Sequence, residues 1–249
     1  MPDLDLRRFK ALTFDCYGTL IDWETGILTV LRAWARRHDA HPSDDALLTA
    51  FAEAEYGCQA ENPEAAYPDV LRSVQGRVAA RLALPSSSAD ADALADSVQD
   101  WPPFDDAPAA LATLNKHYKL VVLSNIDRAS FAHSNRLLGV TFDAVITAQD
   151  VGGYKPGHGH FLRAFELLAG MGIERHEILH VAQSLFHDHV PAQALGLKTV
   201  WVDRRRGRTG WGATPPPPTE VRPDLVVPDL VGLVQLVTQS SRRMNESEP

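Results

Sequence analysis

Two kinds of hydrophobic pattern divide the chain. Residues 10–14, and several segments after residue 118, are short apolar runs bounded by turn residues, which is typical of buried strands. Between about residues 24 and 100, apolar residues instead recur at steps of three and four among Ala, Leu, Glu, Asp and Arg. This spacing predicts amphipathic helices and no strand. A helical region therefore separates the first strand from all the others.

Strand-like and helix-like segments alternate after the paired prolines that follow Trp101. The predicted strands cover 119–125, 142–150, 177–183, 198–203 and the start of 223–239. The predicted helices cover 128–139, 158–172, 188–196 and the end of 223–239. Such alternation, with apolar and β-branched strands, indicates a parallel sheet covered by helices on both faces.

The predicted fold class is α/β, a doubly wound, Rossmann-like parallel sheet with an inserted α-helical cap. Residues 1–22 and 101–240 form the predicted core domain, and residues 23–100 form the predicted cap. Residues 241–249 are mostly polar and charged, and we expect a flexible C-terminal tail there.

Composition narrows the class of protein. The chain has 249 residues, of which 45% are hydrophobic and 22% charged, as in globular proteins with a sizeable core. Its net charge of −8 argues against general nucleic-acid binding. Two cysteines, Cys16 and Cys58, give no disulfide framework and fit a reducing compartment. The sequence has neither an apolar signal segment nor a membrane-spanning stretch, so we expect a cytoplasmic protein without a membrane partner.

Candidate chemical groups gather where predicted strands end. Ligands of open parallel sheets bind beyond the carboxyl ends of the strands. The residues that share this position are Asp15, Thr19, Ser124, Asn125, Lys155, Ser184, His187 and Asp188. Carboxylates, hydroxyls and a lysine at one sheet edge permit covalent catalysis, in which a carboxylate attacks and a cation fixes its charge.

The motifs "DCYGT", "LSN" and "YKP", followed by the segment that begins at His180, occur in the order seen in the haloacid dehalogenase superfamily. The chain resembles that superfamily over nearly its whole length, and the helical stretch falls where the family inserts its cap. Phosphatases of the superfamily carry an aspartate two residues after the nucleophile, where this chain has Tyr17. They also carry a magnesium-binding acid where this chain has Gln183. The pattern "DxYGT" resembles the type II 2-haloacid dehalogenase branch.

This resemblance implies a metal-independent reaction without a cofactor, acting on a small 2-haloalkanoic acid. Asp15 would displace halide from carbon, and water would hydrolyse the resulting ester. Lys155 would steady Asp15, and Asp188 would anchor Lys155 or position water. Ser124 and Thr19 would bind the substrate carboxylate or orient Asp15.

The remaining predicted roles concern substrate binding. Asn125 would hold the departing halide, and the backbone amides of Cys16 and Tyr17 would face the substrate carboxylate. Ser184, His187 and Trp23 are further candidates for the pocket wall. No metal site is predicted. The resemblance also implies dimerisation through the cap.

Two departures from the family keep alternatives open. The dehalogenases grip halide and carboxylate with an arginine early in the cap, but this chain has no Arg or Lys between Arg37 and Arg72. Phe161 stands where the family has a tyrosine. There are two alternative interpretations. One is a magnesium-dependent phosphatase acting on a small phosphate ester, and the other is a non-catalytic binding protein.

Overall fold

A six-stranded parallel sheet forms the centre of the molecule. The computed structural model describes residues 4–245. The strands lie in the order β3-β2-β1-β4-β5-β6, and all neighbours are parallel. They are β1 (Ala11–Phe14), β2 (Lys119–Ser124), β3 (Ala144–Thr147), β4 (Ile178–Ala182), β5 (Lys198–Val202) and β6 (Leu225–Val227). The predicted fold class, a doubly wound parallel sheet, is therefore confirmed.

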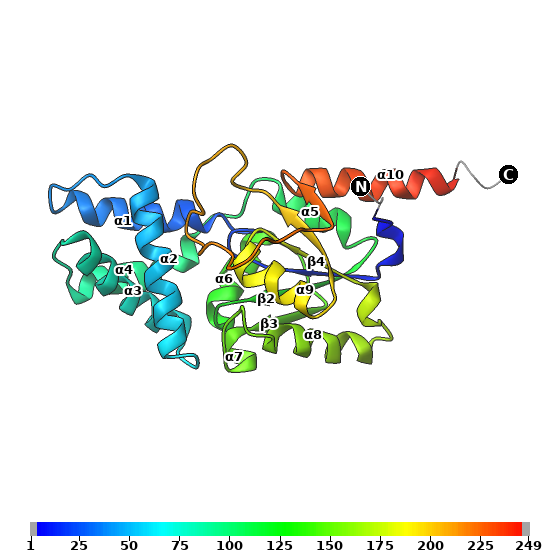
Figure 1. Cartoon of the computed structure of the whole chain (residues 1–249), viewed down its shortest axis with the longest axis horizontal. Helices are drawn as coiled ribbons and strands as arrows, with labels where there is room; N and C mark the ends of the chain where they lie inside the picture. The colour runs from blue at the N-terminus through cyan, green and yellow to red at the C-terminus, as the bar shows by residue number, and fades with distance from the viewer. Residues whose placement is uncertain (1–3, 246–249) are drawn as a thin grey trace.

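Helices cover both faces of the sheet (Figure 1). They are α5 (Ala107–Leu114), α6 (Arg128–Leu138), α7 (Ala148–Val151), α8 (Gly159–Gly170), α9 (Val190–Ala194) and α10 (Leu230–Asn245). Alternate strand residues enter two different apolar clusters, because successive side chains point to opposite faces. Leu12 and Phe14 join the cluster that contains α5 and α10, whereas Ala11 joins the cluster that contains α8 and α9.

Four helices between β1 and β2 form a separate lobe, which we call the cap (left in Figure 1). They are α1 (Trp23–Arg36), α2 (Asp44–Glu61), α3 (Tyr67–Leu82) and α4 (Ser88–Asp96), and a short 3-10 turn (Ser97–Asp100) follows. Ser43 caps α2 by accepting a hydrogen bond from Ala46 N. Ser87 and Asp90 form a capping box at the start of α4.

The two chain segments that join cap and core pair with each other. Ile21 forms an antiparallel bridge with Pro103. On either side of it, Asp22 N donates to Pro102 O (2.8 Å) and Phe104 N donates to Leu20 O (2.9 Å). The cap is thus attached through two neighbouring extended segments.

Some boundaries differ from those predicted. The predicted strand 142–150 ends at Thr147, because Thr147 and Asp150 form a capping box that starts α7. Helix α10 extends to Asn245, into the segment expected to be a flexible tail. Residues 246–249 of that predicted tail lie outside the described residues. Among residues 4–245, no helix has the length and apolar character needed to cross a membrane.

Candidate active site

The carboxyl ends of the strands bring the predicted catalytic residues together. Phe14, the last residue of β1, pairs with Val122 of β2 and Val181 of β4. Asp15 therefore emerges between the ends of these two strands. Lys155 follows α7, and Asp188 lies in a π-helical turn (Leu185–His189) that follows β4.

Lys155 joins the two carboxylates. Its Nζ donates to Asp15 Oδ1 (2.8 Å), to Asp188 Oδ1 (2.7 Å) and to the Leu123 carbonyl (2.8 Å). An ammonium has three protons, so all of them are used. The Lys155 side chain is only 1% exposed. Burial disfavours the charged ammonium, but the two carboxylates outweigh this effect and raise the pKa of Lys155.

The turn after β1 orients Asp15. Thr19 Oγ1 donates to Asp15 Oδ2 (2.7 Å) and accepts a hydrogen bond from Gln183 N (2.9 Å). Gly18 has φ +96°, a conformation that L-residues rarely adopt, and it lets the chain reverse so that Thr19 faces Asp15. Burial raises the pKa of Asp15, and the Asp188 carboxylate adds to this, against the lowering effect of Lys155.

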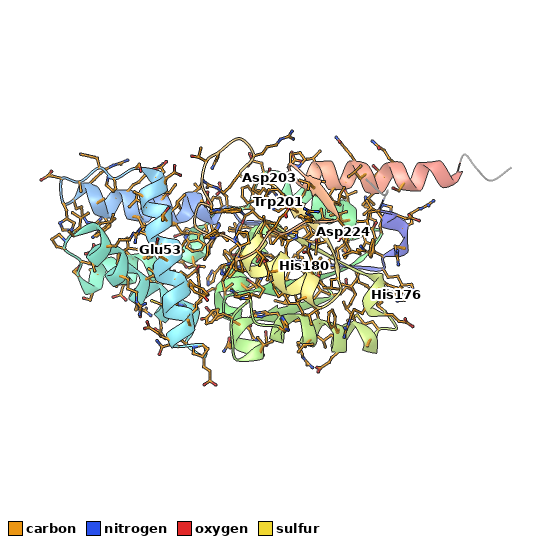
Figure 2. All side chains as sticks on the ribbon, viewed as in Figure 1. Glu53, His176, His180, Trp201, Asp203 and Asp224 are labelled. Atoms are coloured by element: carbon orange, nitrogen blue, oxygen red, sulfur yellow. The ribbon has the colours of Figure 1, made fainter. Side chains whose placement is uncertain are left out.

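Asp188 is held by a second buried chain of hydrogen bonds. His180 Nε2 lies 3.2 Å from Asp188 Oδ1, and His180 Nδ1 lies 2.9 Å from Thr13 Oγ1. His180 is fully buried and is labelled near the middle of the core domain in Figure 2. Burial opposes ionisation of Asp188, but Lys155 and His180 hold the pKa of this carboxyl below its usual range. Oδ2 of Asp188 has no hydrogen-bond partner among the described residues. The Thr13–His180 pair was not predicted from the sequence.

The predicted residues Asn125 and Tyr17 have polar side-chain atoms in contact with other protein groups. Asn125 donates to the Lys155 carbonyl (3.0 Å) and accepts from Lys155 N (2.7 Å), so its side chain fixes the loop that carries Lys155. The Tyr17 hydroxyl lies 2.6 Å from Ser134 Oγ. Ser124 is fully buried, and its Oγ has no partner among the described residues. The Cys16 thiol is also buried, which raises its pKa and keeps it neutral.

Ser184 and His187 lie together beside Asp188. Ser184 Oγ accepts from His187 N (2.9 Å) and lies 3.2 Å from His187 Nδ1. Burial lowers the pKa of His187 to about 4, so the imidazole is neutral at pH 7. Its Nε2 has no partner in the part of the chain that the structure describes.

Many of these residues line a small cavity between core and cap. Its volume is about 30 Å³. The lining from the core is Asp15, Tyr17, Asn125, Lys155, Ser184, His187, Asp188 and Thr214. The lining from the cap is Trp23, Glu55, Gln59 and Tyr67. Of the predicted site residues, only Cys16, Thr19 and Ser124 do not line it.

The cap residues of the cavity were not predicted, with the exception of Trp23. Arg32, Arg36 and Arg37, the arginines of the first cap helix and its end, do not supply the cap arginine that the family has. Arg32 pairs with Asp44 and Arg37 pairs with Asp90, both at the exposed surface, and Arg36 does not line the cavity. Phe161 is fully buried, and its ring packs edge-on against the His180 ring, with 5.0 Å between the two ring centroids.

The donor set fits magnesium poorly. Magnesium binds through carboxylates and other hard oxygens, but one oxygen of Asp15 and one of Asp188 already contact the Lys155 ammonium. The neighbouring positions hold Tyr17 and the amide Gln183 rather than acids. Among residues 4–245, no group of three or more His, Cys, Asp or Glu residues could hold a metal ion.

The fold and the site are those of haloacid dehalogenase-like hydrolases. The family model for haloacid dehalogenase-like hydrolases matches residues 9–185, and the chain belongs to this family. No curated protein sequence matches the chain.

Solved structures with the same fold cover almost the whole chain. The L-2-haloacid dehalogenase PA0810 has a TM-score of 0.72 at 23% identity, over 92% of this chain and 99% of that one. The enzyme from Xanthobacter autotrophicus with chloropropionic acid covalently bound gives 0.70 at 24% identity, over 92% and 98%. The putative hydrolase YfnB from Bacillus subtilis, bound to magnesium, gives 0.72 at 17% identity, over 93% and 99%.

Proposed function

We propose that this protein is a metal-independent hydrolase that removes halide from small 2-haloalkanoic acids through an ester on Asp15. The arrangement of the site carries the proposal. Lys155 contacts both Asp15 and Asp188, as a covalent mechanism on Asp15 requires. Tyr17 stands at the position where a second carboxylate would donate a proton to a leaving group that needs one. Halide departs without a proton. The covalent chloropropionic acid in the X. autotrophicus enzyme supports the same chemistry by similarity.

In the first step, an oxygen of Asp15 forms a bond to the halogen-bearing carbon, and the carbon–halogen bond breaks. The halide leaves with the bonding electron pair, and an aspartyl ester remains. Lys155 and Thr19 hold the carboxylate of Asp15 in place for this attack. Backbone amides of Cys16 and Tyr17 bind the substrate carboxylate.

In the second step, water attacks the carbonyl carbon of the Asp15 ester, and the hydroxy acid leaves with the original Asp15 oxygen. A base must accept a proton from this water. Asp188 Oδ2 and His187 Nε2 are both without partners among the described residues and belong to cavity-lining side chains. Asp188, which is ionised at pH 7, and His187, which is neutral at pH 7, can each accept this proton, and Lys155 stabilises the charge that develops on the ester.

The same family also contains magnesium-bound proteins, so a phosphatase is the alternative to test. The fold alone does not separate the two activities. Tyr17 and the amide Gln183, which stand where the phosphatases have acids, favour the dehalogenase. The third interpretation, a binding protein without catalysis, gives no reason for a buried nucleophile aligned with a lysine.

The proposal is tested by measuring halide release with EDTA present. The substrates are chloroacetate, fluoroacetate and both enantiomers of 2-chloropropionate. The native protein and the Asp105→Asn control, an exposed aspartate near the cap boundary, should release halide. Asp15→Asn should not. After turnover in ¹⁸O-water, the peptide that contains Asp15 should carry ¹⁸O. Phosphate-ester hydrolysis that EDTA abolishes would favour the phosphatase instead.

A further inference from the structure

Glu55 places a carboxyl group in the cap wall of the cavity. It lies on α2, is 3% exposed, and lines the same cavity as Asp15 and Lys155. Tyr67, on α3, donates its hydroxyl to Glu55 Oε1 (2.6 Å). Within residues 4–245, no Lys, Arg or His forms an ion pair with Glu55; its recorded polar contact is this tyrosine.

The surroundings do not compensate a negative charge on Glu55. The titratable groups around it are Cys58 on its own helix, Tyr67 and Tyr154, and across the cavity Asp15, Tyr17, Lys155, His187 and Asp188. Lys155 has no proton left to donate. An unpaired buried carboxylate is costly, so such a group takes up a proton instead. Burial accordingly raises the pKa of Glu55 to about 7, against the smaller lowering effect of the Tyr67 hydrogen bond.

We infer that protonated Glu55 is a substrate-recognition residue, which donates a hydrogen bond from the cap to a small monocarboxylate anion in the cavity. Because Oε1 accepts from Tyr67, Oε2 is the oxygen left to carry the proton and donate it. Gln59 lies one helical turn further along, lines the same cavity and adds an amide donor. This inference rests on the proposed function, since it names how that site selects an anionic substrate without a free cation.

The direction of the pH effect follows from this role. The donor exists while Glu55 is protonated, which is below pH 7. Above pH 7 the ionised carboxylate repels the anion, and affinity falls about tenfold for each pH unit when binding requires one bound proton. A Glu55 that bound cations would give the opposite slope.

Calorimetric titration of the full chain with propionate, an unreactive probe, tests the inference between pH 5.5 and 9. The dissociation constant should stay nearly constant below pH 6.5 and rise about tenfold per unit above pH 7.5. Glu55→Gln keeps a donor and an acceptor for Tyr67, so its dissociation constant should be independent of pH and within about threefold of the native low-pH value. Glu53→Gln is the matched control, because Glu53 is exposed on the same helix (Figure 2) and pairs with Arg81; it should behave like the native protein.

Every outcome decides the question. An absence of propionate binding at pH 5.5, a constant affinity in the native protein, tighter binding at high pH, or a pH dependence that survives in Glu55→Gln would overturn the inference. Halide release with a pH-independent KM would overturn it while leaving the proposed function intact. Propionate binding with the expected pH dependence, but no halide release from any haloacid, would refute the proposed function alone.

Discussion

Removal of the Lys155 ammonium should strongly destabilise the protein at neutral pH, and less so in acid. In Lys155→Met, Asp188 keeps its contact with His180, but Asp15 keeps only the Thr19 hydroxyl. The Asp15 side chain is 8% exposed, so its charge would be buried without a partner. Uptake of a proton relieves this charge. For a carboxyl with a reference pKa of about 3.9, protonation at pH 7 costs roughly 4 kcal/mol, within the range of about 3–5 kcal/mol typical of a broken buried ion pair.

The sign of the pH dependence follows from proton linkage. In the folded variant, Asp15 keeps a proton. In the unfolded variant, Asp15 loses this proton at any pH above its ordinary pKa, so the loss of stability grows as pH rises. At pH 5 the same estimate gives a loss of only about 1.5 kcal/mol. Urea unfolding followed by tryptophan fluorescence, at pH 5 and pH 7, measures both values.

Two control variants sharpen this experiment. Lys198 forms an exposed ion pair with Asp224, so Lys198→Met should cost less than about 1 kcal/mol. The double variant Lys155→Met/Asp15→Asn has no unpaired carboxylate at position 15 and should recover most of the loss, with little pH dependence. Equal losses for the two lysines, or a Lys155→Met loss that does not change between pH 5 and pH 7, would refute the electrostatic reasoning.

Three further substitutions test the elements around the site. Gly18→Ala should lower the free energy of unfolding by about 1 kcal/mol or more and reduce halide release. Gly18 has φ +96°, and the added Cβ would lie 3.0 Å from the Trp23 indole nitrogen. Unchanged thermal unfolding and activity would contradict this. Thr13→Val removes the hydrogen-bond partner of His180 Nδ1, so the free energy of unfolding measured in urea should fall by about 1–2 kcal/mol. An unchanged free energy of unfolding would show that this hydrogen bond is dispensable. Ser87→Ala should lower stability by about 1 kcal/mol through loss of its capping box without altering KM, and a changed KM would show that this cap helix end matters to the substrate.

The core of the site was predictable because parallel strands end at one edge of the sheet. Asp15, Lys155 and Asp188 each follow a recognisable strand, so the sequence order alone indicates that they meet. His180 escaped prediction because β4 is buried on both faces, and in such a strand period-two alternation does not identify a polar position.

The cap side of the site was harder to predict, for a different physical reason. Helical periodicity identifies the inward face of α2, but it does not say which inward residues face the core and which face another cap helix. Phe51, Glu55 and Cys58 follow one another at steps of four and three, and all three are buried. An acid within an apolar stripe was the available signal, since a buried carboxyl that lacks a cation is uncommon outside functional sites.

The pairing of the two linkers separates the parts of the enzyme in a way that matters for its evolution. Every group proposed to form or break bonds belongs to the core, whereas Glu55 and its neighbours belong to a single uninterrupted stretch of chain that enters at Asp22 and returns at Trp101. These two points lie side by side, because Asp22 N bonds to Pro102 O. A different cap can therefore be spliced between them without altering the ends of the sheet strands. Recombination at this junction would give the proposed nucleophile, Asp15, a different cap wall in one step.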